Sequence, residues 1–176
     1  MKKASLFLSL ILLVGCAKNE VHGLDKDSLD FHKLNGISLG SNLEDFVKKY
    51  KGDILVQNYK DISNVVGCEN SKNIIIDNNE TNLDVSSKGF ITAINTTNPR
   101  VIDANGISVG QDSKKLLELK SINKLKKMDN QEGGSYYEYK LVSQDSKFYY
   151  IYTTNQDDKV DSIGLFSKDH INCYED

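Results

Sequence analysis

One short phrase occurs twice in this sequence: NGISLG at residues 35–40 returns as NGISVG at residues 105–110. The two copies are identical except that Leu39 is replaced by Val109. A match this close, at an offset of seventy residues, indicates an internal structural repeat. The segments that follow each copy should therefore resemble each other.

A helix-like stretch follows each copy of the phrase. After the first, Ser41 and Glu44 have the spacing of a capping box, and after the second, Asp112 can cap a helix. The apolar residues recur with helical spacing; they are Leu43, Phe46, Val47 and Tyr50 in the first stretch and Leu116, Leu117 and Leu119 in the second. Each phrase is thus interpreted as a lead-in to a helix.

The glycines that end the two phrases, Gly40 and Gly110, are expected where the backbone needs room or a positive φ. A phosphate-binding loop is the functional alternative, because glycines before a helix N-terminus can hold anions. The pattern lacks the lysine and the full spacing of a P-loop or a dinucleotide fingerprint. The turn interpretation is therefore favoured.

Strand-like segments follow each helix. In the first half they are residues 54–59, 73–77, 82–86 and 90–96, and in the second half 136–142, 147–153 and 160–166. This order predicts an α+β fold of two tandem repeats, each a helix followed by an antiparallel β-meander, with the helices packed on one face of the sheet. Residues 35–104 would form the first repeat and residues 105–176 the second, with Pro99 in the linker.

Alternation along the second meander predicts which residues face the core. A tight loop at residues 143–146 would pair Leu141 with Phe148 and Tyr139 with Tyr150, and the next hairpin would pair Ile163 with Tyr150. The opposite face then carries Tyr136, Glu138, Lys140, Tyr149, Ile151, Thr153 and Val160. Because tyrosine is enriched at interfaces, this face is the candidate partner-binding surface; an ordinary solvated sheet face is the alternative.

The N-terminus has the pattern of a cleaved signal. Lys2 and Lys3 precede an apolar run that is too short to span a bilayer, and the run closes with LVGC at residues 13–16. This ending resembles the lipobox of bacterial lipoproteins, although a plain secretory signal is the alternative. The resemblance implies that residues 1–15 are removed and that Cys16 carries a diacylglycerol. It also implies an anchor in the cell envelope, and in a Gram-negative bacterium Ala17 favours the outer membrane, facing the periplasm.

Behind Cys16, residues 16–34 are polar and charged, and they are interpreted as a flexible, lipidated tether. Cys68 and Cys173 remain as an even pair in an oxidising compartment, so we expect a disulfide; two buried thiols or a metal pair are the alternatives. The three histidines, His22, His32 and His170, lack the spacing of a zinc site and are interpreted as solvated.

The predicted tandem of helix and sheet resembles the β-lactamase inhibitor protein family and, more loosely, the BamE family of outer-membrane assembly lipoproteins. The resemblance covers about residues 35–166 and rests on the lead-in, the amphipathic helix and the meander. It implies a class of envelope proteins that hold other proteins. No binding residue of either family can be assigned to a position in this sequence.

The predicted function is therefore a membrane-anchored lipoprotein that binds another envelope protein as an assembly accessory, an inhibitor or an immunity factor. A lipoprotein that binds a small ligand or a cell-wall fragment in a pocket between the repeats is the alternative. No catalytic residues, cofactor or metal are expected, because the carboxylates, as in residues 155–159, fall in predicted turns. A formal net charge of −3, without a basic block, speaks against nucleic-acid binding.

Overall fold

The computed structural model describes residues 32–61, 65, 68–120, 122–129 and 135–173. The elements are the strands β1 (Lys33–Leu34) and β2 (Ile37–Ser38), helix α1 (Leu43–Lys49), strand β3 (Leu55–Asn58), the 3-10 turn η1 (Tyr59–Asp61), strand β4 (Lys72–Ile76), the 3-10 turn η2 (Asp77–Asn79), the strands β5 (Thr81–Val85) and β6 (Ile91–Thr96), helix α2 (Lys114–Leu117), and the strands β7 (Ile122–Asp129), β8 (Ser135–Val142), β9 (Phe148–Thr154) and β10 (Val160–Ser167). The strands are rich in isoleucine, valine, threonine and tyrosine, which suit a pleated, half-buried surface.

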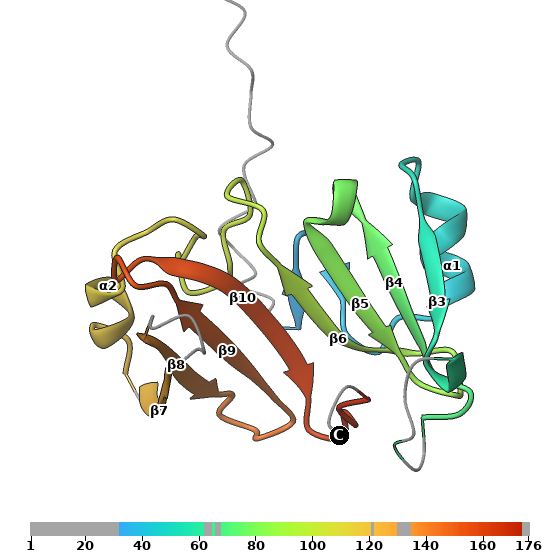
Figure 1. Cartoon of the computed structure of the whole chain (residues 1–176). Helices are drawn as coiled ribbons and strands as arrows, with labels where there is room; N and C mark the ends of the chain where they lie inside the picture. Colours follow the sequence, from blue (N-terminus) through green and yellow to red (C-terminus); the bar gives the residue numbers. More distant parts are fainter. Residues whose placement is uncertain (1–31, 62–64, 66–67, 121, 130–134, 174–176) are drawn as a thin grey trace, which may run out of the picture.

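Eight strands form one antiparallel sheet in the order β3-β4-β5-β6-β10-β9-β8-β7 (Figure 1). The two halves of the chain meet where β6 pairs with β10, with Ile94 opposite Leu165. A row of apolar residues then crosses all eight strands on one face; it consists of Val56, Ile74, Leu83, Ile94, Leu165, Tyr150, Leu141 and Ile122. We call this the inner face.

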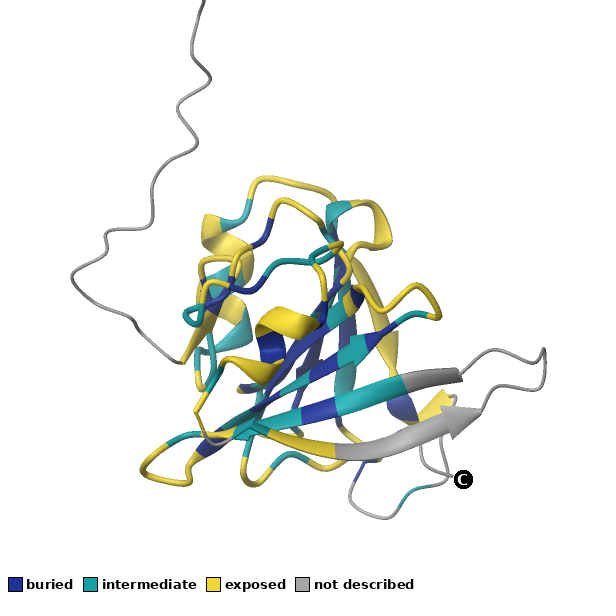
Figure 2. Cartoon of the chain, turned by 90° about the vertical axis from the view of Figure 1, so that its left-hand side faces the viewer, coloured by how far each residue is buried: buried dark blue, intermediate teal, exposed yellow. Residues whose placement is uncertain are grey.

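The inner face is covered by the segments that lie between the strands in sequence. Leu34 and Ile37 from the β1–β2 hairpin, Ile107 from the loop before α2, and Leu116 from α2 are all buried in the same core cluster as the strand residues. Leu43, Phe46 and Tyr50 of the α1 region pack against that cluster. Figure 2 shows buried positions along the strands and exposed positions over the covering helices and loops.

The predicted fold class is wrong. The chain is mostly β, with one eight-stranded sheet, one two-stranded sheet, a helix α1 of 7 residues and a helix α2 of only 4. It does not consist of two helix-plus-meander repeats, because α2 is a single turn and all eight strands belong to one sheet over one shared core. A sheet must bury its apolar face against other elements, and here a hairpin, loops and two short helices provide that cover instead of two long helices.

The repeated phrase encodes a turn that docks on a strand. Gly40 N–H donates to the carbonyl of Ile91 at 2.8 Å, and Gly110 N–H donates to the carbonyl of Val160 at 2.7 Å. Both glycines have positive φ, +77° and +85°, so this prediction is confirmed. Ile91 begins β6 and Val160 begins β10, so each phrase fixes the start of a strand at the central junction.

The second phrase is also held by a buried carboxylate, that of Asp103. Its oxygens accept hydrogen bonds from the backbone N–H groups of Asn105 at 2.9 Å and Ile107 at 2.8 Å, and from the Tyr152 hydroxyl at 2.5 Å. Burial raises the pKa of Asp103 above its ordinary value, although these hydrogen bonds act in the opposite direction. The turn is therefore tied to the middle of β9.

The helix predictions were partly correct. Asn42, and not Ser41, caps α1, because its Oδ1 accepts from Glu44 N–H at 2.8 Å. Asp112 Oδ1 accepts from Lys114 N–H at 2.9 Å, but the helix that follows has only one turn, in which Leu116 is buried and Leu117 is 61% exposed. The apolar spacing of a short helix does not by itself determine which of its residues reaches the core.

Candidate functional site

The outer face of the sheet, opposite the inner face, brings together the residues predicted to bind a partner. Burial alternates strictly along β9, where Tyr149, Ile151 and Thr153 are half-buried and point outward while Tyr150 and Tyr152 are buried. On β8, Glu138 pairs with Thr153 and Lys140 pairs with Ile151, so these side chains share the same face. Tyr136 belongs to β8, but its side chain lies outside the described part of the structure.

The predicted register was wrong by two residues, although the assignment of faces holds. Leu141 pairs with Tyr150, not with Phe148, and Ile163 pairs with Tyr152, not with Tyr150. Because side chains alternate with a period of two, a shift of two residues leaves every side chain on its original face. The exception is Val160, which is 1% exposed because the register shifts between Val160 and Ser162.

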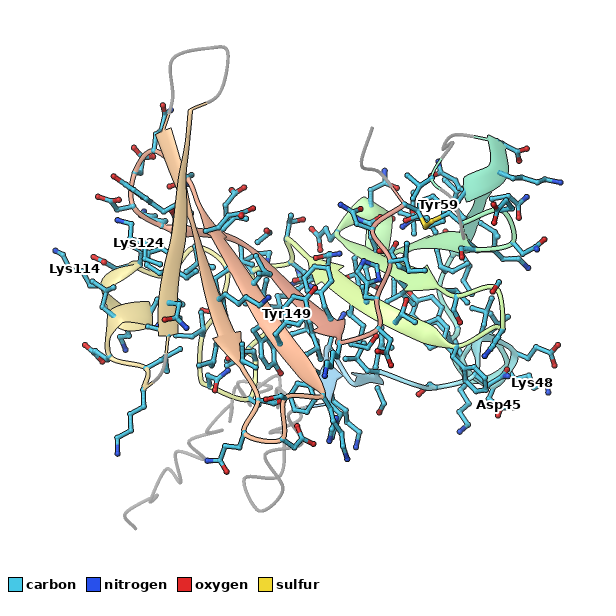
Figure 3. All side chains as sticks on the ribbon, turned by 90° about the horizontal axis from the view of Figure 1, so that it is seen from below. Asp45, Lys48, Tyr59, Lys114, Lys124 and Tyr149 are labelled. Atoms are coloured by element: carbon cyan, nitrogen blue, oxygen red, sulfur yellow. A yellow bond between two sulfur atoms is a disulfide. The ribbon has the colours of Figure 1, made fainter. Side chains whose placement is uncertain are left out.

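Tyr149 lies on β9, the third strand from the β7 edge of the sheet (Figure 3). Its ring contacts a cation and a second aromatic ring. The Lys140 ammonium is 4.0 Å from the centre of its ring, and the Phe166 ring stacks on it with centroids 5.2 Å apart and an interplanar angle of 13°. Burial raises the pKa of the Tyr149 hydroxyl. These contacts hold the Tyr149 ring in one orientation.

Phe166 was not among the predicted site residues, although its position in the alternation could have found it. It pairs with Tyr149, whereas its neighbour Leu165 faces the core. A Cβ atom on Gly164 would lie 2.5 Å from the Phe166 ring, so the missing side chain at Gly164 makes room for that ring. The outer face therefore includes an aromatic pair that strand β10 builds with β9.

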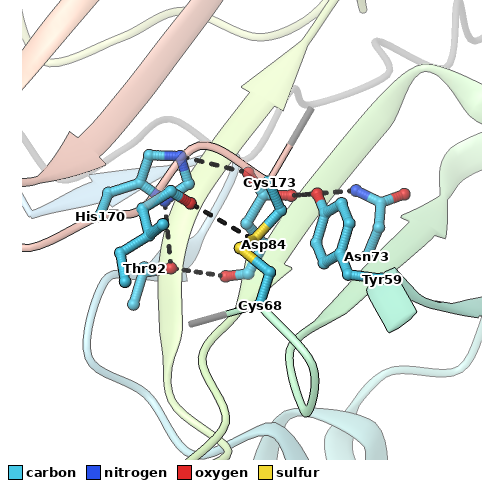
Figure 4. Close-up of polar contacts among 8 residues, drawn as sticks. Tyr59, Cys68, Asn73, Asp84, Thr92, His170 and Cys173 are labelled. Atoms are coloured by element: carbon cyan, nitrogen blue, oxygen red, sulfur yellow. Dashed lines mark hydrogen bonds and ion pairs between the residues drawn. A yellow bond between two sulfur atoms is a disulfide. The ribbon is translucent and has the colours of Figure 1, made fainter. Parts of the chain in front are cut away.

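The chain after β10 crosses the outer face toward β5, and its first anchor is His170. The rings of Phe166 and His170 lie 5.2 Å apart, and the His170 side chain is only 5% exposed. His170 Nε2 is 3.5 Å from Asp84 Oδ2, and Nδ1 is 3.3 Å from the hydroxyl of Thr92 (Figure 4). The interpretation of His170 as a solvated histidine is wrong.

Burial lowers the pKa of His170, and the facing carboxylate of Asp84 opposes that shift. Asp84 Oδ1 in turn accepts hydrogen bonds from the Tyr59 hydroxyl at 2.5 Å and from Asn73 Nδ2 at 3.1 Å. Since the partners of Asp84 come from η1 and β4, the group ties the C-terminal segment to the first half of the sheet. No spacing in the sequence marks these residues as neighbours.

The disulfide between Cys68 and Cys173 is the second anchor of this segment, and the predicted pairing is confirmed. Both cysteines are buried in a small cluster with Tyr59, apart from the main core (Figure 4). A hollow of about 60 Å³ lies beside them, lined in part by Asp84, Thr92 and Ile171. Ligand pockets are typically about 300–1,000 Å³, so this hollow is too small for a cell-wall fragment.

The other predictions concern features that the structure leaves untested. The signal, Cys16 and most of the tether are outside the described residues, whereas Leu34, assigned to the tether, is buried in β1.

His32 contacts the Phe148 ring edge-on, with the two ring centroids 4.3 Å apart. Within the described part of the chain, no group of three or more histidine, cysteine, aspartate or glutamate residues is placed to hold a metal, and no helix has the length and apolarity to cross a membrane.

Comparison with known proteins does not identify a functional site for this chain. No protein-family model, curated protein or solved structure matches it. The candidate functional site is accordingly defined by the outer face over β8, β9 and β10.

Proposed function

We propose that this chain is a membrane-anchored lipoprotein of the cell envelope that binds another envelope protein and performs no catalysis itself. The observation that carries this proposal is the oriented Tyr149 ring on an outer face that neither helix of the described part of the chain covers over β8–β10. Leu43 and Phe46 of α1 and Leu116 of α2 join the core cluster on the inner face. An uncovered sheet face with a fixed aromatic residue is suited to contact with a partner.

The surroundings of Tyr149 favour a protein partner over a small ligand. Ile151 and Phe166 supply apolar contact beside it, and Glu138 and Lys140 place opposite charges along β8. This mixture of aromatic centre and charged surroundings is typical of transient protein interfaces. A tyrosine whose orientation is already fixed loses little side-chain entropy on binding.

The proposed location follows from the lipobox resemblance at Cys16 and from Ala17: the outer membrane, with the protein facing the periplasm. The partner would be an assembly component, an enzyme to be inhibited or an envelope-targeting toxin. His170 is enclosed by Phe166, Asp84 and Thr92, so it is not placed to act on a substrate in solution.

Tyr149→Ala is expected to weaken partner binding by about tenfold or more, because truncation of a central aromatic residue typically costs more than 1 kcal/mol of binding energy. The measurement is affinity capture from membranes with the lipidated full chain, followed by mass spectrometry. Stability should change by only about 1 kcal/mol, because the ring is half-buried.

Leu117→Ala is the matched control, because Leu117 is a large exposed residue on α2, away from the outer face. It should capture the partner as wild type does. Equal capture by the Tyr149→Ala and wild-type proteins would refute the outer face as the contact surface.

Cys16→Ser is expected to abolish lipid attachment and to release or misprocess the protein, because only a thiol can form the thioether to diacylglycerol that the lipobox resemblance implies. Metabolic labelling with a fatty-acid analogue measures this directly. The wild-type protein should take up label and the variant should not. An unlabelled wild-type protein would show that Cys16 is not an anchor.

A further inference from the structure

The two edges of the large sheet differ in how they are protected. Edge strand β7 carries Lys124, Lys126 and Lys127, and its pairing with β8 is irregular between Lys124 and Lys126. Lysines and bulges are the usual means by which proteins prevent an edge from pairing with another strand. Edge strand β3 has the sequence LVQN, without a charge, and all four residues are exposed.

The hydrogen-bond pattern shows which backbone groups of β3 are free. Tyr59 N–H donates to the carbonyl of Ser71 at 3.1 Å, in register with the β3–β4 pairing. Since bonded pairs recur every second residue in an antiparallel ladder, Gln57 and Leu55 also bond toward β4. The N–H and C=O groups of Val56 and Asn58 therefore point away from the sheet, and no group in the described part of the chain bonds to them.

We propose that the β3 edge binds an extended segment of a partner protein as an additional strand of the sheet. Only an extended backbone presents donors and acceptors at the spacing that Val56 and Asn58 require. Leu55 and Val56 point to opposite faces and are 53% and 49% exposed, so they offer apolar contact on both sides of the added strand. Because β3 has no charge, the segment should be uncharged where it pairs.

An extended segment of a partner protein fits the β3 edge better than a second copy of this chain does. A pairing of two β3 strands would join only 4 residues from each copy. Stable protein interfaces bury roughly 1,200–2,000 Å², far more than so short a strand pair can supply. An added segment is held by main-chain hydrogen bonds and by pockets for its alternate side chains, so it does not need a second folded surface to pack against.

The test uses the full chain in detergent micelles and an acetylated, amidated peptide of the sequence SKNIIID. This is the sequence of residues 71–77, which contain β4, the strand that already pairs with the other side of β3. The lysine and the aspartate of this peptide lie outside its central NIII segment. A peptide with proline in place of the middle isoleucine is the control ligand, because proline removes a donor from the ladder.

Amide hydrogen exchange measured by NMR should distinguish the free amides of β3 from those already bonded to β4. With the peptide bound, the amides of Val56 and Asn58 should exchange about tenfold more slowly, whereas those of Leu55 and Gln57, already bonded to β4, should not change. Slower exchange on β7, or on β8–β10 alone, would overturn the proposal. Protection that appears without peptide and rises with protein concentration would also overturn it, because the occupant would then be a second copy.

Variants of Val56 test the same backbone groups directly. Val56→Pro removes an N–H that the β3–β4 ladder does not use, so the protein should fold while peptide protection at Asn58 is lost. Val56→Thr keeps the N–H and the branched side chain, and it should bind as wild type does. If Val56→Pro does not fold, Val56→Lys replaces it as the variant that blocks the edge. Undiminished binding by the edge-blocking variant would refute the site.

Discussion

Replacing Cys68 and Cys173 together with alanine is expected to lower the free energy of unfolding by about 4–5 kcal/mol. The disulfide spans a sequence separation of 105 residues, so it restricts the unfolded chain over most of the described sequence. Without it the unfolded state gains the conformational entropy of that large loop. This cost is a large fraction of the total stability of an ordinary domain, about 5–15 kcal/mol.

Denaturant unfolding of the oxidised wild-type and double-alanine proteins measures this difference, and the slope of the transition should rise because the unlinked chain exposes more surface. Addition of a reductant to the wild type should reproduce the loss, whereas the variant should not respond to it. A difference below about 1 kcal/mol would contradict the entropic account.

Asp103→Ala is expected to lower the free energy of unfolding by about 3–5 kcal/mol. Its carboxylate accepts from the backbone N–H of Ile107 and from the hydroxyl of Tyr152, and both donors lose their partner when it is removed. Each buried donor without a partner costs about 1–3 kcal/mol. The turn of the second repeated phrase should loosen as well, because Asn105 N–H also bonds to Asp103.

Asp103→Asn distinguishes the charge from the hydrogen bonds through the pH dependence of stability. The pKa of Asp103 in the folded protein lies above the ordinary value of 3.8, so between these two values the folded state binds more protons than the unfolded state. The stability of the wild type relative to Asp103→Asn should therefore fall as pH rises through this window. Denaturant unfolding at a series of pH values measures the difference; a rise with pH would contradict the assignment.

Strand positions were predictable because a half-buried strand carries its own signal. Tyr150 and Tyr152 alternate with Tyr149 and Ile151 in the sequence as they do in burial. Strand β7 was missed because it lies at an edge: its lysines, such as Lys124, protect the strand from pairing and also break the apolar alternation. A protected edge strand therefore resembles a polar loop when only the sequence is considered.

For the candidate site, the sequence predicted which side chains share a face but not the contacts between distant segments. The faces of Tyr149 and Tyr150 follow from the period of two, which survives a register error of two residues. Val160 could not be placed, because a local irregularity inverts the alternation without altering composition. The contact between His170 and Asp84 could not be predicted either, since it joins residues from β5 and the C-terminal segment that no local pattern connects.

The sequence by itself determined the local features of this protein: the positive φ of Gly40 and Gly110, the alternating strands, and the pairing of Cys68 with Cys173. Each depends on a residue's own conformational preference or on a count of reactive groups. Only the tertiary structure decided that the repeated phrases start β6 and β10 at the centre of one sheet. It also decided that the C-terminal segment crosses the outer face to reach Asp84 of β5 and Cys68, because such contacts depend on which distant surfaces become adjacent when a common core is buried.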